Sequence, residues 1–181
     1  FRLFLFRSII ATPYTDAEEF FADFLFNEEL MVYSADKIAN EKGDQFIMPS
    51  DIDVNKVWLL EEGNCLRTQF ENICHLRENS LKPKNLDFMA SNINTLVHMV
   101  DKIGGLTILP ELAVSQLSEG QKDKIHHFTR PFPSREISLI YYKPTYKQKI
   151  LDELVASIKD SLSPKLNYTT HPEDFVNISP Q

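Results

Sequence analysis

The chain has 181 residues, of which 43% are hydrophobic and 25% are charged, a composition typical of a domain with a buried core. Its formal net charge of -7 argues against binding of this part of the chain to a phosphate backbone, because that binding needs clustered lysine and arginine. Two cysteines are too few for a secreted disulfide scaffold of this length. No segment approaches the roughly 20 apolar residues of a membrane span, so we expect a cytoplasmic protein that does not contact a membrane.

The first half of the chain predicts buried strands followed by a short helix. Apolar runs at residues 8–13, 28–34 and 56–60 are typical of buried strands. The turn EEGN follows the third run, and the side chain of Asn64 can cap a helix that begins at about Cys65. We expect this helix to end before the linker NSLKPKN.

The second half predicts further strands that alternate with two helices. Strands are expected at LDFMA (86–90), LTILP (106–110) and REISLIYYK (135–143). One helix, capped by Ser91, should end at Gly104 and Gly105, and a last helix should open at Pro144 and Thr145. This alternation predicts an α/β sheet with mainly parallel strands, whose ligands gather at the carboxyl ends of the strands. The EEGN turn lies at such an end.

The two cysteines, Cys65 and Cys74, share the first predicted helix. Nine residues of helix place them about 13 Å apart along the axis and half a turn round, whereas a disulfide needs Cα atoms within about 7 Å. A disulfide between them would therefore require the helix to melt. The partial positive charge at the helix N-terminus favours a thiolate at Cys65, which peroxide would convert to a sulfenic acid that Cys74 could resolve.

A second interpretation of the cysteines stays open at this point. Free cysteines are among the most buried residue types, and two on an amphipathic helix are often core residues. If the redox interpretation holds, Arg67 and Arg135 are candidate charges to stabilise the thiolate or the leaving oxygen. The histidines show no metal-binding spacing, so we expect neither a metal nor another cofactor.

The segment WLLEEGNCLRTQFENIC resembles the redox segment of the OxyR peroxide sensors, a branch of the LysR-type transcriptional regulators, including the cysteine separation. The segments ASNINTLVHMVDKIGGLTILPELAV and FPSREISLIYYKP resemble LysR-type effector domains more generally. The resemblance implies that Cys65 reacts with peroxide, that Cys74 resolves it and that Arg135 lies near the reactive thiol. Asn64 stands where relatives often have histidine, and it is a further candidate site residue beside Arg67.

The resemblance also implies a fold of two α/β lobes like those of type II periplasmic binding proteins. Residues 9–33 and 134–162 would form a partial first lobe, and residues 34–133 a second lobe that carries the redox cysteines. Residues 163–181 would form a loose C-terminal tail. The winged helix-turn-helix domain and the opening half of the first lobe, with the threonines of the peroxide pocket, are expected to be absent.

The function that this resemblance implies is that of a transcriptional activator switched by hydrogen peroxide, not an enzyme. A reversible Cys65–Cys74 disulfide would remodel the local helix and the pairing of subunits in a homotetramer. Promoter DNA would bind through the absent N-terminal winged helix-turn-helix, and glutaredoxin or thioredoxin would reduce the disulfide. The alternatives are an effector domain that binds a small metabolite between its lobes, with inert cysteines, and a thiol peroxidase that turns over.

Overall fold

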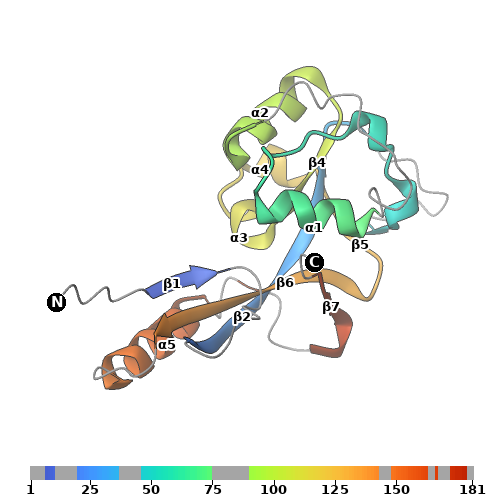
Figure 1. Cartoon of the computed structure of the whole chain (residues 1–181). Helices are drawn as coiled ribbons and strands as arrows, with labels where there is room; N and C mark the ends of the chain where they lie inside the picture. Colours follow the sequence, from blue (N-terminus) through green and yellow to red (C-terminus); the bar gives the residue numbers. More distant parts are fainter. Residues whose placement is uncertain are drawn as a thin grey trace.

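A computed structural model describes residues 7–10, 20–36, 46–74, 90–142, 148–162, 166 and 172–178. These residues form a mixed α/β fold (Figure 1). Its strands are β1 (Arg7–Ile10), β2 (Phe20–Ser34), β3 (Phe46–Ile47), β4 (Leu106–Pro110), β5 (Ile125–Phe128), β6 (Phe132–Tyr142) and β7 (Phe175–Asn177). Its α-helices are α1 (Cys65–Ile73), α2 (Ile93–Ile103), α3 (Glu111–Val114), α4 (Glu119–Lys122) and α5 (Gln148–Leu162). Short 3₁₀ turns lie at Pro49–Asp51, Val54–Lys56 and Pro172–Asp174.

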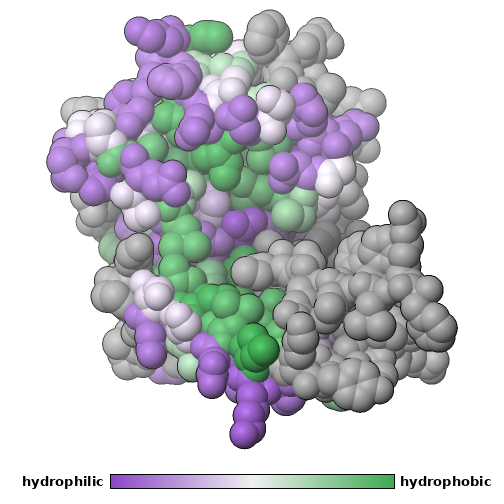
Figure 2. Space-filling view, turned by 90° about the vertical axis from the view of Figure 1, so that its left-hand side faces the viewer, coloured by the Kyte–Doolittle hydropathy of each residue, from purple (hydrophilic) through white to green (hydrophobic). Residues whose placement is uncertain are grey.

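The long strand β2 joins two hydrophobic cores. Its first half contributes Leu25 and Phe26 to a smaller core, which also contains side chains of β6 and α5. Its second half contributes Leu30 to a larger core, which α1, α2 and β4 cover. Figure 1 shows β2 running from the part of the molecule that contains α5 to the part that contains β4. Figure 2 shows hydrophobic side chains continuing from one part to the other on the face that it displays.

The pairing of β2 with β6 contains a β-bulge. Phe24 faces Ser138 and Phe26 faces Ile137, so that Leu25 is an extra residue in β2. An extra residue of this kind bends the strand and increases its local twist. Beyond the bulge the antiparallel register continues and places Glu28 opposite Arg135.

The prediction of mainly parallel strands is wrong. Strand β2 pairs antiparallel with β4, β5 and β6, and β1 also pairs antiparallel with β6. Among the described residues, the parallel pairings are β3 with β5, β6 with β7 and two isolated bridges, Val57 with Leu106 and Leu60 with Ala90. Strand β2 pairs with strands that lie about 75 to 120 residues further along the chain and not with its sequence neighbours. The alternation of strands and helices along the sequence does not reveal such long-range pairing.

Several local predictions are confirmed. Helix α1 begins at Cys65, and the side chain of Asn64 accepts a hydrogen bond from the Leu66 N–H, as predicted for a cap. Strand β4 has the predicted bounds, and residues 28–34 form the second half of β2. Helix α2 ends before Gly104, but its cap is Asn92 and not Ser91, because the Asn92 side chain accepts from the Thr95 N–H at 2.9 Å.

The predicted strand at residues 56–60 is only partly formed. Residues 57–60 are buried, but the segment pairs only through isolated parallel bridges, Val57 with Leu106 and Leu60 with Ala90. The Thr107 hydroxyl donates to the Trp58 carbonyl at 2.9 Å and occupies an acceptor that a continuous ladder would use. Of the strand predicted at 86–90, only Ala90 lies within the described residues, and Pro144 and Thr145 lie outside them.

Within the tail predicted at residues 163–181, the described residues 172–178 are not loose. Strand β7 pairs with the start of β6, and the Ile178 N–H donates to the Ser134 carbonyl at 2.8 Å. The Gln69 amide of α1 donates to the Ile178 carbonyl at 3.3 Å. These hydrogen bonds hold the segment against β6 and α1. No described helix is long and apolar enough to cross a bilayer.

Candidate functional site

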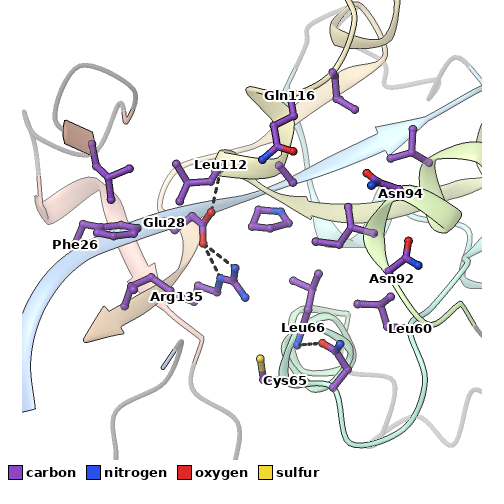
Figure 3. Close-up of a pocket in the computed structure, with 18 of the residues that line it drawn as sticks. Phe26, Glu28, Leu60, Cys65, Leu66, Asn92, Asn94, Leu112, Gln116 and Arg135 are labelled. Atoms are coloured by element: carbon purple, nitrogen blue, oxygen red, sulfur yellow. Dashed lines mark hydrogen bonds and ion pairs between the residues drawn. The ribbon is translucent and has the colours of Figure 1, made fainter. Parts of the chain in front are cut away.

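A pocket of about 850 Å³ lies where the two hydrophobic cores meet. Its walls are mostly apolar, with an ion pair and several side-chain amides among them (Figure 3). The lining residues from the β2 and β6 strands are Leu25, Phe26, Glu28, Arg135 and Ile137. Those from α1 and its approach are Leu60, Asn64, Cys65 and Leu66. Helices α2, α3 and α5 and their flanking residues supply the remaining lining residues.

Cys65 reaches this pocket because it is the first residue of α1. Asn64 caps the helix by accepting from the Leu66 N–H at 3.0 Å, which fixes the backbone on both sides of the cysteine. The Cys65 thiol is free and half-buried. The positive end of the α1 dipole therefore lies at a thiol that borders a cavity.

Arg135 enters the same pocket from β6. Its Nε and Nη2 atoms both lie 2.8 Å from one carboxylate oxygen of Glu28. The other oxygen of Glu28 accepts from the Leu112 N–H at 3.0 Å. In the view of Figure 3 the Arg135 guanidinium lies between Glu28 and the helix that carries Cys65. The pocket thus combines the Cys65 thiol with the Arg135 guanidinium, whose Nε and Nη2 atoms are held by Glu28.

Cys74 lies at the other end of α1, where it is the C-terminal cap residue and its N–H donates to the Phe70 carbonyl. It packs against the larger core, and its thiol is free. Burial raises the pKa of the Cys74 thiol to about 12. In this conformation Cys74 is therefore protonated at neutral pH and is a poor nucleophile.

Arg67 has different partners from Arg135. Its guanidinium lies 2.9 Å from a carboxylate oxygen of Glu71 and 3.6 Å from one of Glu62, and it also donates to the Leu60 carbonyl. It is not among the residues that line the pocket. The structure therefore brings Asn64, Cys65 and Arg135 together and places Arg67 and Cys74 elsewhere.

Sequence reasoning missed the two adjacent carboxylates of β2. Glu28 and Glu29 are both buried, with 1% and 3% exposure, and they have different partners. Glu29 accepts from His127 at 2.8 Å, and this hydrogen bond raises the pKa of His127 despite its partial burial. Two glutamates inside an apolar strand are the only sequence signal for this pair, since buried carboxylates need partners. Among the described residues, no group of three potential ligands could hold a metal ion.

Comparison with known proteins gives a consistent family. The model of the LysR substrate binding domain matches residues 8–163. The HTH-type transcriptional regulator EstR of Acinetobacter baylyi is 33% identical over 110 residues, which cover 60% of this chain and 36% of EstR. A hydrogen peroxide-inducible genes activator of Dickeya chrysanthemi is 29% identical over 151 residues, which cover 81% of this chain and 47% of the activator.

Solved structures share the fold. Reduced OxyR from Porphyromonas gingivalis matches with a TM-score of 0.76 at 22% identity, over 94% of this chain and 76% of that one. The predicted type II periplasmic-binding-protein-like LysR effector fold is therefore confirmed. The chain spans about half the length, or less, of the curated relatives named here. With residues 8–163 matched by the family model and the fold shared, the chain belongs to the LysR substrate binding domain family.

Proposed function

We propose that this domain senses hydrogen peroxide within a transcriptional regulator. The observation that carries the proposal is the position of Cys65, a free thiol at the N-terminus of α1 that borders a pocket with Arg135. Similarity to hydrogen peroxide-inducible genes activators supports the same function.

The chemistry requires two steps. The Cys65 thiolate attacks one oxygen of hydrogen peroxide, the O–O bond breaks, and the departing hydroxide takes a proton to leave as water. The product is a sulfenic acid at Cys65. The Cys74 sulfur then attacks the Cys65 sulfur, an S–S bond forms, and the hydroxyl leaves as a second water with the proton of the Cys74 thiol.

The second step demands a change of structure. The two cysteines lie at opposite ends of α1, about 13 Å apart along its axis, and a disulfide needs Cα atoms within about 7 Å. Disulfide formation would therefore unwind α1 and release the hydrogen bonds that its residues make. We infer that this remodelling alters the pairing of subunits in a homotetramer.

The wider role follows from the family. We infer that a winged helix-turn-helix elsewhere in the protein binds promoter DNA in the cytoplasm, and that the change of subunit pairing alters this binding. Thiol reductants such as glutaredoxin or thioredoxin would restore the reduced state. In this role the domain acts as a switch and not as an enzyme.

The first experiment is intact-mass analysis and peptide mapping before and after about one equivalent of hydrogen peroxide. Loss of two hydrogens with a crosslink between Cys65 and Cys74, reversed by reductant, is the expected result. A sample with alkylated thiols is the control and should not change. Thiols that stay reduced in the folded protein would contradict the proposal, and sustained peroxide consumption with a reductant would indicate a thiol peroxidase instead.

The pocket itself favours a second candidate function. A cavity of about 850 Å³ with mostly apolar walls and a few polar groups has the size of a small-molecule site. A LysR effector domain that binds a small metabolite there would not need the cysteines. A C65S/C74S double variant that keeps its transcriptional response, together with ligand-dependent thermal stabilisation, would select this alternative.

A further inference from the structure

The side chain that holds Arg135 in the pocket is Glu28, a residue to which neither the sequence nor the comparisons assign a role. We propose that Glu28 is a positioning residue, which keeps the Arg135 guanidinium in the pocket that Cys65 borders and thereby accelerates the attack of the thiolate on peroxide. The inference deepens the proposed function and rests on it.

The backbone places the two residues together. Glu28 of β2 and Arg135 of β6 are direct cross-strand partners in the antiparallel register, just beyond the bulge at Leu25. Cross-strand partners have Cβ atoms about 4.5–5.5 Å apart, so their side chains leave the sheet side by side. Both residues line the pocket that Cys65 borders.

The Glu28 carboxylate is itself fixed. It is 1% exposed, and its two oxygens have different tasks. One oxygen accepts from the Leu112 N–H at the start of α3, and the other accepts from both Nε and Nη2 of Arg135. A carboxylate held by a helix N-terminus and a strand at the same time cannot turn without losing one of these bonds.

This arrangement leaves part of the guanidinium available. Nε and one N–H of Nη2 are directed at Glu28, and among the described residues no acceptor pairs with Nη1. The N–H groups of Nη1 can therefore donate to a thiolate or to an oxygen atom in the pocket. Figure 3 shows the guanidinium held on the Glu28 side, with Cys65 on the opposite side.

Two effects of Glu28 on Cys65 oppose each other. Its negative charge offsets that of Arg135 and disfavours a nearby thiolate. Its hydrogen bonds, however, restrict a long side chain that has many rotamers when it is unpaired. Because a Coulomb interaction weakens with distance, a displaced arginine stabilises the thiolate less. We infer that positioning is the larger effect.

The test is the rate of Cys65 oxidation in Glu28→Gln as a function of pH. Glutamine retains the size of the side chain, but it has no negative charge and only one oxygen. It therefore cannot accept from Arg135 with one oxygen and from the Leu112 N–H with the other. We expect the second-order rate with hydrogen peroxide to fall about tenfold at pH 7, and the pH of half-maximal rate to rise. An unchanged rate, or a faster rate with a lower pH of half-maximal rate, would overturn the proposal.

Glu29→Gln is the matched control. Glu29 is the adjacent buried carboxylate of the same strand, but it pairs with His127 and does not line the pocket. This variant should lose similar stability and keep the rate of Cys65 oxidation within about twofold. If both variants slow oxidation equally, the effect is structural and the proposal fails.

Two further measurements keep the result interpretable. If Glu28→Gln does not fold, Glu28→Asp retains the charge but is one methylene shorter, and it should still slow the reaction. The alkylation rate of Cys65 with iodoacetamide reports on the thiolate without peroxide. If the wild-type protein resists peroxide but its alkylation slows in the Glu28 variants, the proposed function fails while the positioning role survives. If wild-type oxidation is fast and the Glu28 variants match it, only the positioning role fails.

Discussion

The two ends of α1 place the two thiols of this chain in different surroundings. At the N-terminal end, Cys65 is half-buried, borders a pocket of about 850 Å³ and lies at the positive end of the helix dipole. At the C-terminal end, Cys74 packs against the larger core, and burial raises the pKa of its thiol to about 12.

The difference assigns an order to the chemistry. A thiol that borders a pocket can react first, and a thiol that packs against the core and stays protonated reacts slowly until its surroundings change. In the mechanism that we propose, the helix between the two thiols is therefore the barrier to the second step. The predictions that follow test this contrast, beginning with the largest expected effect.

Substituting the two cysteines separately should give the strongest contrast. In C65S the second-order rate of thiol oxidation should fall by at least about 100-fold, because a pKa of about 12 leaves roughly one Cys74 thiolate in 10⁵ at pH 7. In C74S the first step should continue, and dimedone should trap a sulfenic acid at Cys65. Rapid oxidation in C65S would reverse the assignment of the two roles.

The raised pKa of Cys74 also predicts a loss of stability in alkaline solution. Burial raises the pKa from 9.0 to about 12, so the unfolded chain releases this proton before the folded chain does. The contribution of Cys74 to the free energy of unfolding is constant below pH 9 and declines as the pH rises from about 9 towards 12. Urea titrations between pH 7 and 11 should show that the free energy of unfolding of the wild type falls above about pH 9. The same titrations of C74S should lack this decline.

The N-terminal end of α1 can be altered without changing Cys65. Asn64→Asp retains a capping oxygen and adds a negative charge, which should slow oxidation of Cys65 roughly fivefold, as about 1 kcal/mol between charges 4 Å apart in water implies. Asn64→Ala has no added charge but removes the cap, at a cost of about 1 kcal/mol of stability. Stopped-flow rates and thermal unfolding of both variants separate charge from capping. Equal rates in the two variants would contradict the electrostatic explanation.

The smallest effect on the reaction is expected for Arg67. This side chain pairs with Glu71 and Glu62 and does not line the pocket, so Arg67→Gln should keep the rate of Cys65 oxidation within about twofold. It should lower the free energy of unfolding by about 1–3 kcal/mol, because the Leu60 carbonyl and Glu71 lose a charged donor. A large fall in the rate with no loss of stability would restore Arg67 as a residue of the site.

Much of the local structure was predictable from the sequence. The cap at Asn64, the start of α1 at Cys65 and the end of α2 before Gly104 depend on neighbouring residues, and these features are confirmed. The cap of α2 was misplaced by one residue, because Ser91 and Asn92 are both good capping residues and only the backbone geometry decides between them.

The long-range features could not be derived in this way. The antiparallel pairing of β2 with β6 joins residues such as Glu28 and Arg135, which are 107 positions apart. No local pattern encodes that register, and the sequence indicates a site role for Arg135 mainly through a family resemblance. The sequence shows Glu28 only as part of an apolar strand, and its burial beside an arginine becomes evident only when the strands are paired.

The bulge at Leu25 lets β2 vary the side chains that line the pocket without changing the pairing of its later residues with β6. In a regular strand adjacent side chains point to opposite faces, yet Leu25 and Phe26 both line the pocket. The residues beyond the bulge keep their own register, in which Glu28 faces Arg135. Deleting Leu25 would therefore reshape the apolar wall while leaving the ion pair in register. The presence or absence of this one extra residue can thus change the shape of the pocket without changing its charge.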